Sequence, residues 1–156
     1  MITIKDLTVK NFMSVGNVTQ AVRFTDNGLT LVLGNNVDLG GDGSRNGTGK
    51  TTIINALSYA IYGNALTNIR KDNLINKTNG KAMLVTLDFV KDGVQYRIER
   101  GRRPNLLKYY VNEQNVDEDE AQGENRQTQS DIEKLFGMSH DMFKHIVALN
   151  TYTEPF

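Results

Sequence analysis

The chain has 156 residues, in which 18 lysines and arginines balance 18 aspartates and glutamates, and it has no cysteine. This length predicts one domain over residues 1–156, while the missing cysteines exclude disulfide bridges, thiolate zinc sites and cysteine nucleophiles. The neutral total charge argues against a dedicated nucleic-acid domain, and without a long apolar run or a signal peptide's basic start we expect a cytoplasmic protein with no membrane span.

The first part of the chain predicts strands that lead into a glycine-rich loop and a helix. Three segments have the apolar patterns of strands: 2–9, 18–24 and 29–33. The loop follows from Gly34 to Gly49. Apolar residues at helical spacing then predict a helix over 53–62, and Gly63 stands where a C-terminal cap belongs.

The second part predicts an antiparallel meander and two helices. Strands are expected over 83–90, 94–98 and 107–111, with a tight turn at 91–93 that makes the first two a β-hairpin. Loops are expected over 64–81, with one helical turn, and over 112–127. Ser130 begins a capping box (SDIE) that predicts a helix ending at Gly137, and Ser139 is expected to cap a last helix.

Residues 44–51 (SRNGTGKT) match the phosphate-binding Walker A pattern G-x-x-x-x-G-K-[ST] except at Ser44. Glycines allow the backbone to approach a polyphosphate, and N–H groups at a helix start point at the anion. Lys50 would reach the β- and γ-phosphates, the Thr51 hydroxyl would coordinate Mg²⁺, and Thr52 would bind a phosphate nearer the nucleoside. The strand before the motif and the helix after it favour nucleotide binding over a chance glycine loop. The predicted nucleotide-binding residues are Asn46, Gly47, Thr48, Gly49, Lys50, Thr51 and Thr52.

The phosphate loop is longer than usual. Fourteen residues separate Gly34 from Gly49, where the usual pattern has four. Residues 35–44 therefore read as an insertion, for which two interpretations are open. The insertion flaps over or beside the nucleotide, or it is a disordered excursion.

Two further segments imitate motifs of small P-loop enzymes. Residues 84–88 (LVTLD) form an apolar run that ends in Asp88, as a Walker B acid would, but the run continues into a hairpin turn. Residues 76–79 (NKTN) resemble the guanine-specificity motif, but Asn79 stands where that motif has Asp. We interpret both as accidental, which leaves half of an ATPase site. The alternatives are a self-contained small P-loop kinase or GTPase, which would need Asp88, and a non-catalytic nucleotide-gated interaction module.

Five segments together resemble the N-terminal half of an ATP-binding-cassette head of the SMC/SbcC type, and the resemblance extends over nearly the whole chain. They are 10–16 (KNFMSVG), 46–51 (NGTGKT), 57–63 (LSYAIYG), 96–100 (YRIER) and 137–149 (GMSHDMFKHIVAL). The Walker A segment is generic, whereas the hairpin and the last segment make the match specific.

The resemblance implies an α/β P-loop NTPase fold, the N-terminal lobe of an ABC-type head with an antiparallel β-hairpin subdomain. It implies that ATP and Mg²⁺ bind here and that the complete protein is an ATPase of DNA double-strand-break repair and recombination. The implied partners are a second copy of the head, an SbcD-type metallo-nuclease subunit and double-stranded DNA ends. ATP-driven head dimerisation would then gate the nuclease.

The chain also departs from the family pattern. The family's Q-loop glutamine aligns with Thr151, or alternatively with Asn150. The chain ends at Phe156, where the coiled coil should begin, so the C-terminal lobe with its signature motif, Walker B pair and switch histidine is missing. We therefore assign no catalytic residue and expect ATP binding without hydrolysis by this chain alone. For His140 and His145 we expect packing or surface roles.

Basic side chains are concentrated near the predicted hairpin, and two interpretations of them are open. They contact the DNA backbone without sequence preference, or they form a solvated hairpin edge. The set comprises Arg97, Arg100, Arg102, Arg103 and Lys108.

Overall fold

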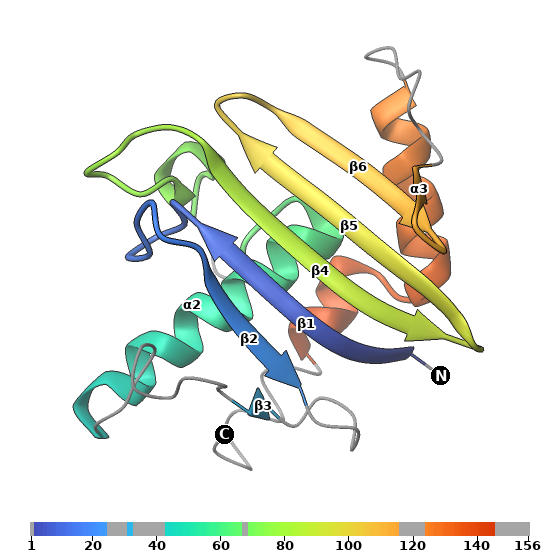
Figure 1. The fold of residues 1–156 in the computed structure, drawn as a ribbon, viewed down its shortest axis with the longest axis horizontal. Helices are drawn as coiled ribbons and strands as arrows, with labels where there is room; N and C mark the ends of the chain where they lie inside the picture. The colour runs from blue at the N-terminus through green and yellow to red at the C-terminus, as the bar shows by residue number, and fades with distance from the viewer. Residues whose placement is uncertain (1, 25–30, 33–42, 67–68, 116–123, 146–156) are drawn as a thin grey trace.

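A seven-stranded antiparallel sheet organises the fold in our computed structural model, which describes residues 2–24, 31–32, 43–66, 69–115 and 124–145. The strands are β1 (Ile2–Lys10), β2 (Gln20–Phe24), β3 (Leu31–Val32), β4 (Met83–Lys91), β5 (Val94–Arg102), β6 (Leu106–Val111) and β7 (Gln114–Asn115). The helices are α2 (Gly43–Tyr62), the 3₁₀-helix η1 (Lys71–Leu74), α3 (Glu124–Phe136) and a final helical segment over 140–145. Figure 1 shows α2 crossing behind the sheet and α3 beside β6.

The strand order β3-β2-β1-β4-β5-β6-β7 places β1 between strands from both parts of the chain. The predicted hairpin is confirmed: β4 pairs antiparallel with β5, and Asp92 and Gly93 take the positive φ angles that a tight hairpin turn requires. The hairpin is not a separate unit, because β4 also pairs with β1 from Ile2 opposite Lys91 to Lys10 opposite Leu84. One continuous sheet therefore supports the whole domain.

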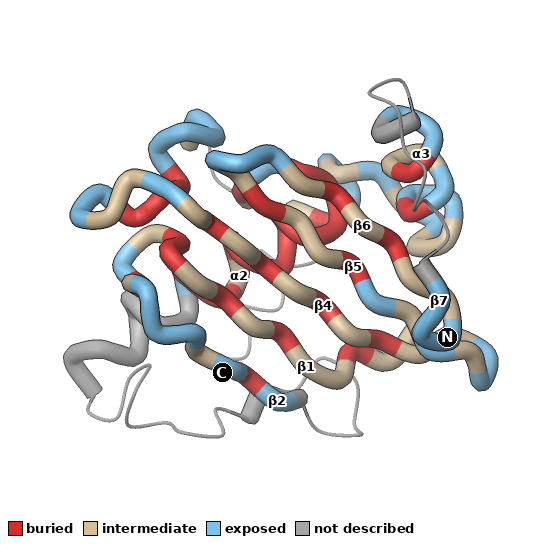
Figure 2. The backbone as a smooth tube through the Cα atoms, turned by 45° about the horizontal axis from the view of Figure 1, so that its top comes forward, coloured by how far each residue is buried: buried red, intermediate tan, exposed pale blue. Residues whose placement is uncertain are grey.

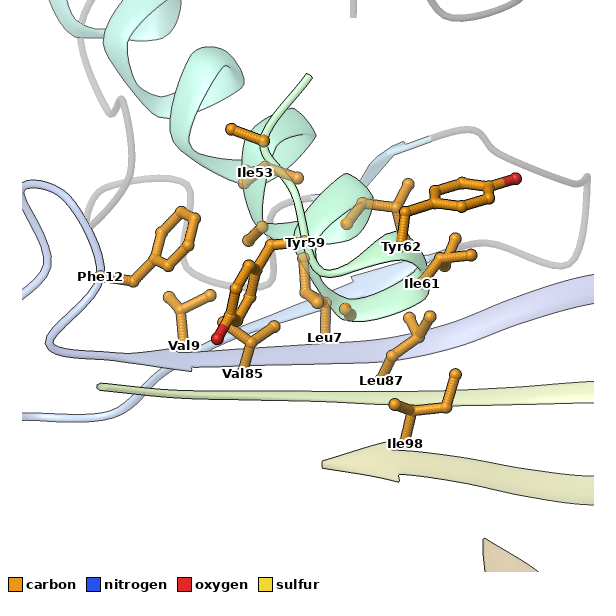
Figure 3. Close-up of a cluster of buried hydrophobic side chains, with 14 of the residues drawn as sticks. Leu7, Val9, Phe12, Ile53, Tyr59, Ile61, Tyr62, Val85, Leu87 and Ile98 are labelled. Atoms are coloured by element: carbon orange, nitrogen blue, oxygen red, sulfur yellow. The ribbon is translucent and has the colours of Figure 1, made fainter. Parts of the chain in front are cut away.

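The core lies between this sheet and α2. Inward-facing residues alternate along β4, so that Val85 and Leu87 are completely buried, and Figure 2 shows the same alternation along neighbouring strands. In Figure 3 the side chains of α2 and of the strands meet in this layer, with Tyr59 and Ile61 facing Leu7. The expected strand-and-helix architecture is thus confirmed, and Gly63 ends α2 with a φ of +77° and an N–H donated to the Tyr59 carbonyl.

The final helical segment covers the side of α2 that faces away from the sheet. The Tyr62 ring lies 4.9 Å from the ring of His140 and 5.4 Å from that of Phe143, measured between centroids. The Ser58 hydroxyl lies 2.8 Å from Nε2 of His140, and burial lowers the pKa of this histidine. Ser139 accepts the Met142 N–H at its hydroxyl, as predicted for a capping residue. His140 therefore has the packing role that we expected.

Helix α3 begins earlier than the sequence predicts. We expected a capping box at Ser130 to start it, whereas the helix starts at Glu124 and Ser130 lies inside it. The additional turns are polar and are held by tertiary contacts, since Gln129 donates to the Ile61 carbonyl at the end of α2. Gly137 ends α3 as predicted, with a φ of +70°. None of the described helices has the length and apolar character that crossing a bilayer needs.

Four asparagines form a clasp between the loop after β1 and the loop before β4. Asn11, which is fully buried, donates to Oδ1 of Asn17 at 2.7 Å and accepts from Nδ2 of Asn79 at 2.7 Å. Asn76 donates to the Met13 carbonyl at 2.9 Å and accepts the Asn79 N–H at 3.2 Å. Residues 76–79, which imitate a guanine-specificity motif, are therefore structural.

We predict that Asn11→Ala destabilises the fold by about 2–4 kcal/mol, because buried partners lose their hydrogen bonds. Alanine would also be strained at the φ of +51° that Asn11 adopts. Urea unfolding measures this cost. The exposed Asn73, which lies outside the clasp, is the matched control, and Asn73→Ala should cost about 0.5 kcal/mol or less; equal costs for the two variants would contradict the clasp.

Candidate nucleotide-binding site

The Walker A residues lie in the first turns of α2. Residues 43–50 are helical in the structure, whereas we expected loop as far as Gly49. Each glycine in a helix interior costs only about 1 kcal/mol relative to alanine, so an established helix can extend through Gly47 and Gly49. The helix therefore starts at Gly43, and the expectation that the loop continues as far as Gly49 is wrong. Residues 33–42, which hold most of the proposed insertion, lie outside the described residues.

The two threonines after the motif differ in exposure. Thr51 is exposed, whereas Thr52 is 3% exposed and packs inside the protein. Residues 46–51 contain the groups that the two ligands require: a hydroxyl oxygen for Mg²⁺, and a lysine and backbone N–H groups for the polyphosphate. The role of Thr51 as a metal ligand stays a prediction, whereas Thr52 could bind a phosphate only after local rearrangement. Thr151 and Asn150, the Q-loop candidates, lie outside the described residues.

Asp88 lies within β4 on the face of the sheet directed away from α2. Its carboxylate accepts Nε of Arg97 at 2.7 Å and Nη2 at 3.4 Å. A Walker B acid would instead stand at the end of a strand beside the phosphates. This placement agrees with our interpretation that residues 84–88 imitate the motif by accident.

Arg100 binds the C-terminal end of α2. Its guanidinium donates to the carbonyls of Ala60 and Ile61 at 3.1 and 3.4 Å and to the amide oxygen of Gln129. It also lies 6.0 Å from the centroid of the Tyr59 ring. Burial lowers the pKa of Arg100 to about 10, which still leaves it charged at neutral pH. Because its donors are occupied inside the protein, we withdraw Arg100 from the candidate DNA-contacting residues.

The remaining basic residues do not form one patch. Arg97 and Lys108 project from the outer face of the sheet, since their strand neighbours Ile98 and Leu107 are buried on the inner face. Arg102 is bound to Asp72 at 2.6 Å on the inner side, and Arg103 follows at the strand end with its side chain 58% exposed. The structure thus separates the predicted set into two surfaces.

Sequence reasoning missed a cation-lined cleft at the opposite end of α2. Lys71, Arg126 and Lys134 line it together with Arg100 and Arg102. Lys71 lies in η1, whereas Arg126 and Lys134 lie in α3, far away in the sequence, so no local pattern indicates all three.

Comparison with known proteins places residues 6–153 in the family whose model is described as AAA domain. "Exonuclease subunit 2" of Enterobacteria phage T4 is 34% identical over 142 residues, which are 91% of this chain and 23% of that protein. The "DNA double-strand break repair Rad50 ATPase" of Archaeoglobus fulgidus is 33% identical over 100 residues, 64% of this chain and 10% of that one. The chain therefore spans less than a quarter of the curated relatives that it matches.

Solved structures of similar fold include SMC proteins. One is reported as "Structural biochemistry of ATP-driven dimerization and DNA stimulated activation of SMC ATPases", with a TM-score of 0.53, 20% identity, and coverage of 88% of this chain and 81% of that one. Another is the Smc head domain of Pyrococcus furiosus, with a TM-score of 0.52, 18% identity, and coverage of 90% and 35%. At these identities the likeness establishes the fold, which confirms the predicted P-loop head.

We predict that Arg100→Lys lowers the free energy of unfolding by about 1.5–3 kcal/mol. An ammonium group is a point donor and cannot bridge the two α2 carbonyls and Gln129 as the guanidinium fork does. The matched control is Arg97→Lys at the exposed ion pair with Asp88, which should cost less than about 1 kcal/mol. Urea denaturation measures the free energy of unfolding of both variants. Similar losses of this free energy would argue against Arg100 as the anchor of α2.

Proposed function

This chain belongs to the AAA-domain family, and from that premise we propose that it is the N-terminal, ATP-binding lobe of an SbcC-type ATPase head. The observation that carries the proposal is the Walker A motif at the start of α2, in a fold shared with SMC heads. Its relatives are a phage exonuclease subunit and a Rad50 double-strand-break repair ATPase. In the complete protein the head would hydrolyse ATP during DNA repair and recombination.

The proposed ATP site uses the residues predicted from the motif. Backbone N–H groups from Asn46 to Gly49 receive the phosphates, Lys50 neutralises the β- and γ-phosphates, and Thr51 supplies a hydroxyl to Mg²⁺. Mg²⁺ held by Thr51 would offset the negative charge of the phosphates. Thr52 joins this set only if the start of α2 rearranges, because it is buried.

Nucleotide binding is proposed to unwind the first turns of α2. The N–H groups of residues 47–50 are engaged while the backbone is helical, and they become free for phosphate when the helix starts near Gly49. Gly47 and Gly49 make the helical state of this segment weak, so charge-assisted phosphate contacts can replace it.

The proposed assembly follows from the relatives. ATP would close two heads on each other and thereby control an SbcD-type metallo-nuclease partner at double-stranded DNA ends, in the host cytoplasm if a phage encodes the chain. The catalytic acids, the signature motif and a coiled coil would lie in a polypeptide region beyond this lobe. Thr151 would stand at the Q-loop position.

A second candidate function is a non-catalytic nucleotide-gated interaction module, which shares the ATP site but lacks turnover. A self-contained kinase or GTPase is disfavoured, because Asp88 is paired with Arg97 inside a strand. Asn76 and Asn79 are likewise used in the asparagine clasp.

We predict that Lys50→Ala weakens ATP binding about 10- to 150-fold, since a charge-assisted phosphate contact is worth about 1.5–3 kcal/mol. Titration calorimetry measures the affinity, with the exposed Lys77→Ala as the control that should bind like the wild type. An unchanged affinity in Lys50→Ala would refute the Walker A assignment. In the wild-type protein, adding a polypeptide with the complementary C-terminal lobe should start ATP hydrolysis, and continued absence of turnover would favour the non-catalytic module.

For DNA we propose contacts to the phosphate backbone from two separate surfaces, one with Arg97 and Lys108 on the outer face of the sheet and one with Arg102 and Arg103 at the end of β5. Neutralising Arg103 and Lys108 together, as Arg103→Gln and Lys108→Gln, should reduce the slope of log affinity against log salt by about 2, because each lost phosphate contact removes about 0.9. Fluorescence anisotropy with a labelled duplex and the complete protein measures the slope. An unchanged slope would favour the other interpretation, in which these residues form a solvated hairpin edge.

A further inference from the structure

A cleft of about 920 Å³ lies at the C-terminal end of α2, on the opposite end of this helix from the Walker A residues. Its walls come from η1, the turn between β5 and β6, α3 and the connection that follows α3. This volume is at the upper end of the range for pockets that bind small molecules or short segments. Nothing in the proposed ATPase cycle uses the cleft.

The rim of the cleft carries three cations without partners among the described residues. Lys71, Arg126 and Lys134 are exposed, and their side chains form no hydrogen bond or ion pair within the part of the chain that the structure describes. The carboxylate in the lining is that of Glu133, which accepts a hydrogen bond from Gln129 at 2.9 Å. The rim therefore has an excess of positive charge.

The back of the cleft adds a buried charge. The Arg100 guanidinium is bound only by neutral oxygens, those of two α2 carbonyls and of the Gln129 amide, among the residues described. The negative end of the α2 dipole offsets part of this charge. A ligand anion in the cleft would interact with the remainder in surroundings of low dielectric constant, where charge interactions are stronger than in water.

The cleft also has apolar surface. Leu106 and Met138 line it and are partly accessible, beside the more deeply buried Leu107. A ligand that satisfied only the cations would leave these side chains in contact with water. The lining is therefore complementary to a ligand with both carboxylates and apolar groups.

We propose that this cleft binds an acidic peptide segment with apolar side chains, supplied by a partner protein. Its carboxylates pair with Lys71, Lys134 and Arg126, and its apolar side chains cover Leu106 and Met138. Charge complementarity carries the assignment, because an acidic segment provides both kinds of group in one extended chain.

Nucleic acid fits the cleft less well. A duplex is too wide to enter a cleft of this volume, and the phosphates that it would present leave the apolar lining uncovered. A single strand binds mainly by stacking bases on exposed aromatic rings. The aromatic ring in the lining is that of Tyr59, which is 3% exposed and is covered by the Arg100 guanidinium.

The experiment selects binders from a displayed library of random 12-residue peptides on the complete protein. Enriched peptides should combine Asp or Glu with Leu, Ile or Phe. Their affinity, measured by anisotropy on synthesised copies, should fall about 10-fold or more in the double variant Lys71→Glu with Lys134→Glu. The matched control is Lys77→Glu with Lys81→Glu, which makes the same change of charge at exposed lysines outside the cleft and should leave the affinity unchanged.

Several outcomes would overturn the proposal. Equal affinities of the two double variants would show that the peptides bind elsewhere, and enrichment of neutral peptides would remove the role of charge. A labelled dT oligonucleotide that binds the wild type, and binds the cleft variant about 10-fold more weakly, would assign the cleft to nucleic acid. A gain in peptide affinity on changing the acidic run 117–120 to amides would make the occupant part of this chain. ATP affinity serves as a separate readout, so failure here is distinguishable from failure of the ATPase proposal.

Discussion

The enclosure of α2 is the constraint on which the rest of the structure depends. From Thr52 to Tyr62 every side chain except that of Ile54 is buried, so the helix needs a cover on both sides. The sheet supplies one cover, and the final helical segment supplies the other through Tyr62 and its ring contacts. The C-terminal part of α2 is thereby fixed, while its first turns, rich in glycine, can change conformation without disturbing the core.

Arg100 completes this enclosure at the C-terminal end of α2, where buried backbone carbonyls would otherwise lack hydrogen-bond donors. The last carbonyls of a helix have no partner within it, and a helix end buried among apolar residues must find donors elsewhere. Arg100 from β5 and Gln129 from α3 both donate to the Ile61 carbonyl, so the sheet and α3 meet at one oxygen. The same arrangement concentrates positive charge at this end of the helix and creates the cleft behind it.

Local chemistry made much of this fold predictable. Lys91-Asp92-Gly93 between two alternating apolar runs specifies the β4–β5 hairpin, and Gly63 and Gly137 specify helix ends, because few other residues adopt the required backbone angles. The interpretation of Asp88 rested on the same local reasoning. The Walker A residues were recognisable because phosphate binding needs glycine and lysine at fixed spacing.

Tertiary contacts account for what the sequence could not show. Asn79 was noticed only as part of an accidental motif, and its contact with Asn11 was not predicted, since a clasp between segments 68 residues apart leaves no local signal. The first turns of α3 are polar and depend on contacts such as that of Gln129 with α2, so periodicity indicates only the later turns. Arg100 looked like its exposed neighbours because alternation along β5 shows which side chains share a face but not what each one touches.

The position of β1 has a consequence for how the molecule is made. The partners of β1 in β4 come much later in the sequence. Ile2 pairs with Lys91, which is 89 positions later, and Lys10 pairs with Leu84, which is 74 positions later. During synthesis about 90 residues must therefore emerge before the edge of β1 that pairs with β4 finds its partner, which at 5–20 residues per second takes several seconds at least. Because the pairings within the β4–β5–β6 meander are local and the pairing of β1 with β4 is not, we expect the meander to form first and to offer β4 as the edge on which β1 docks.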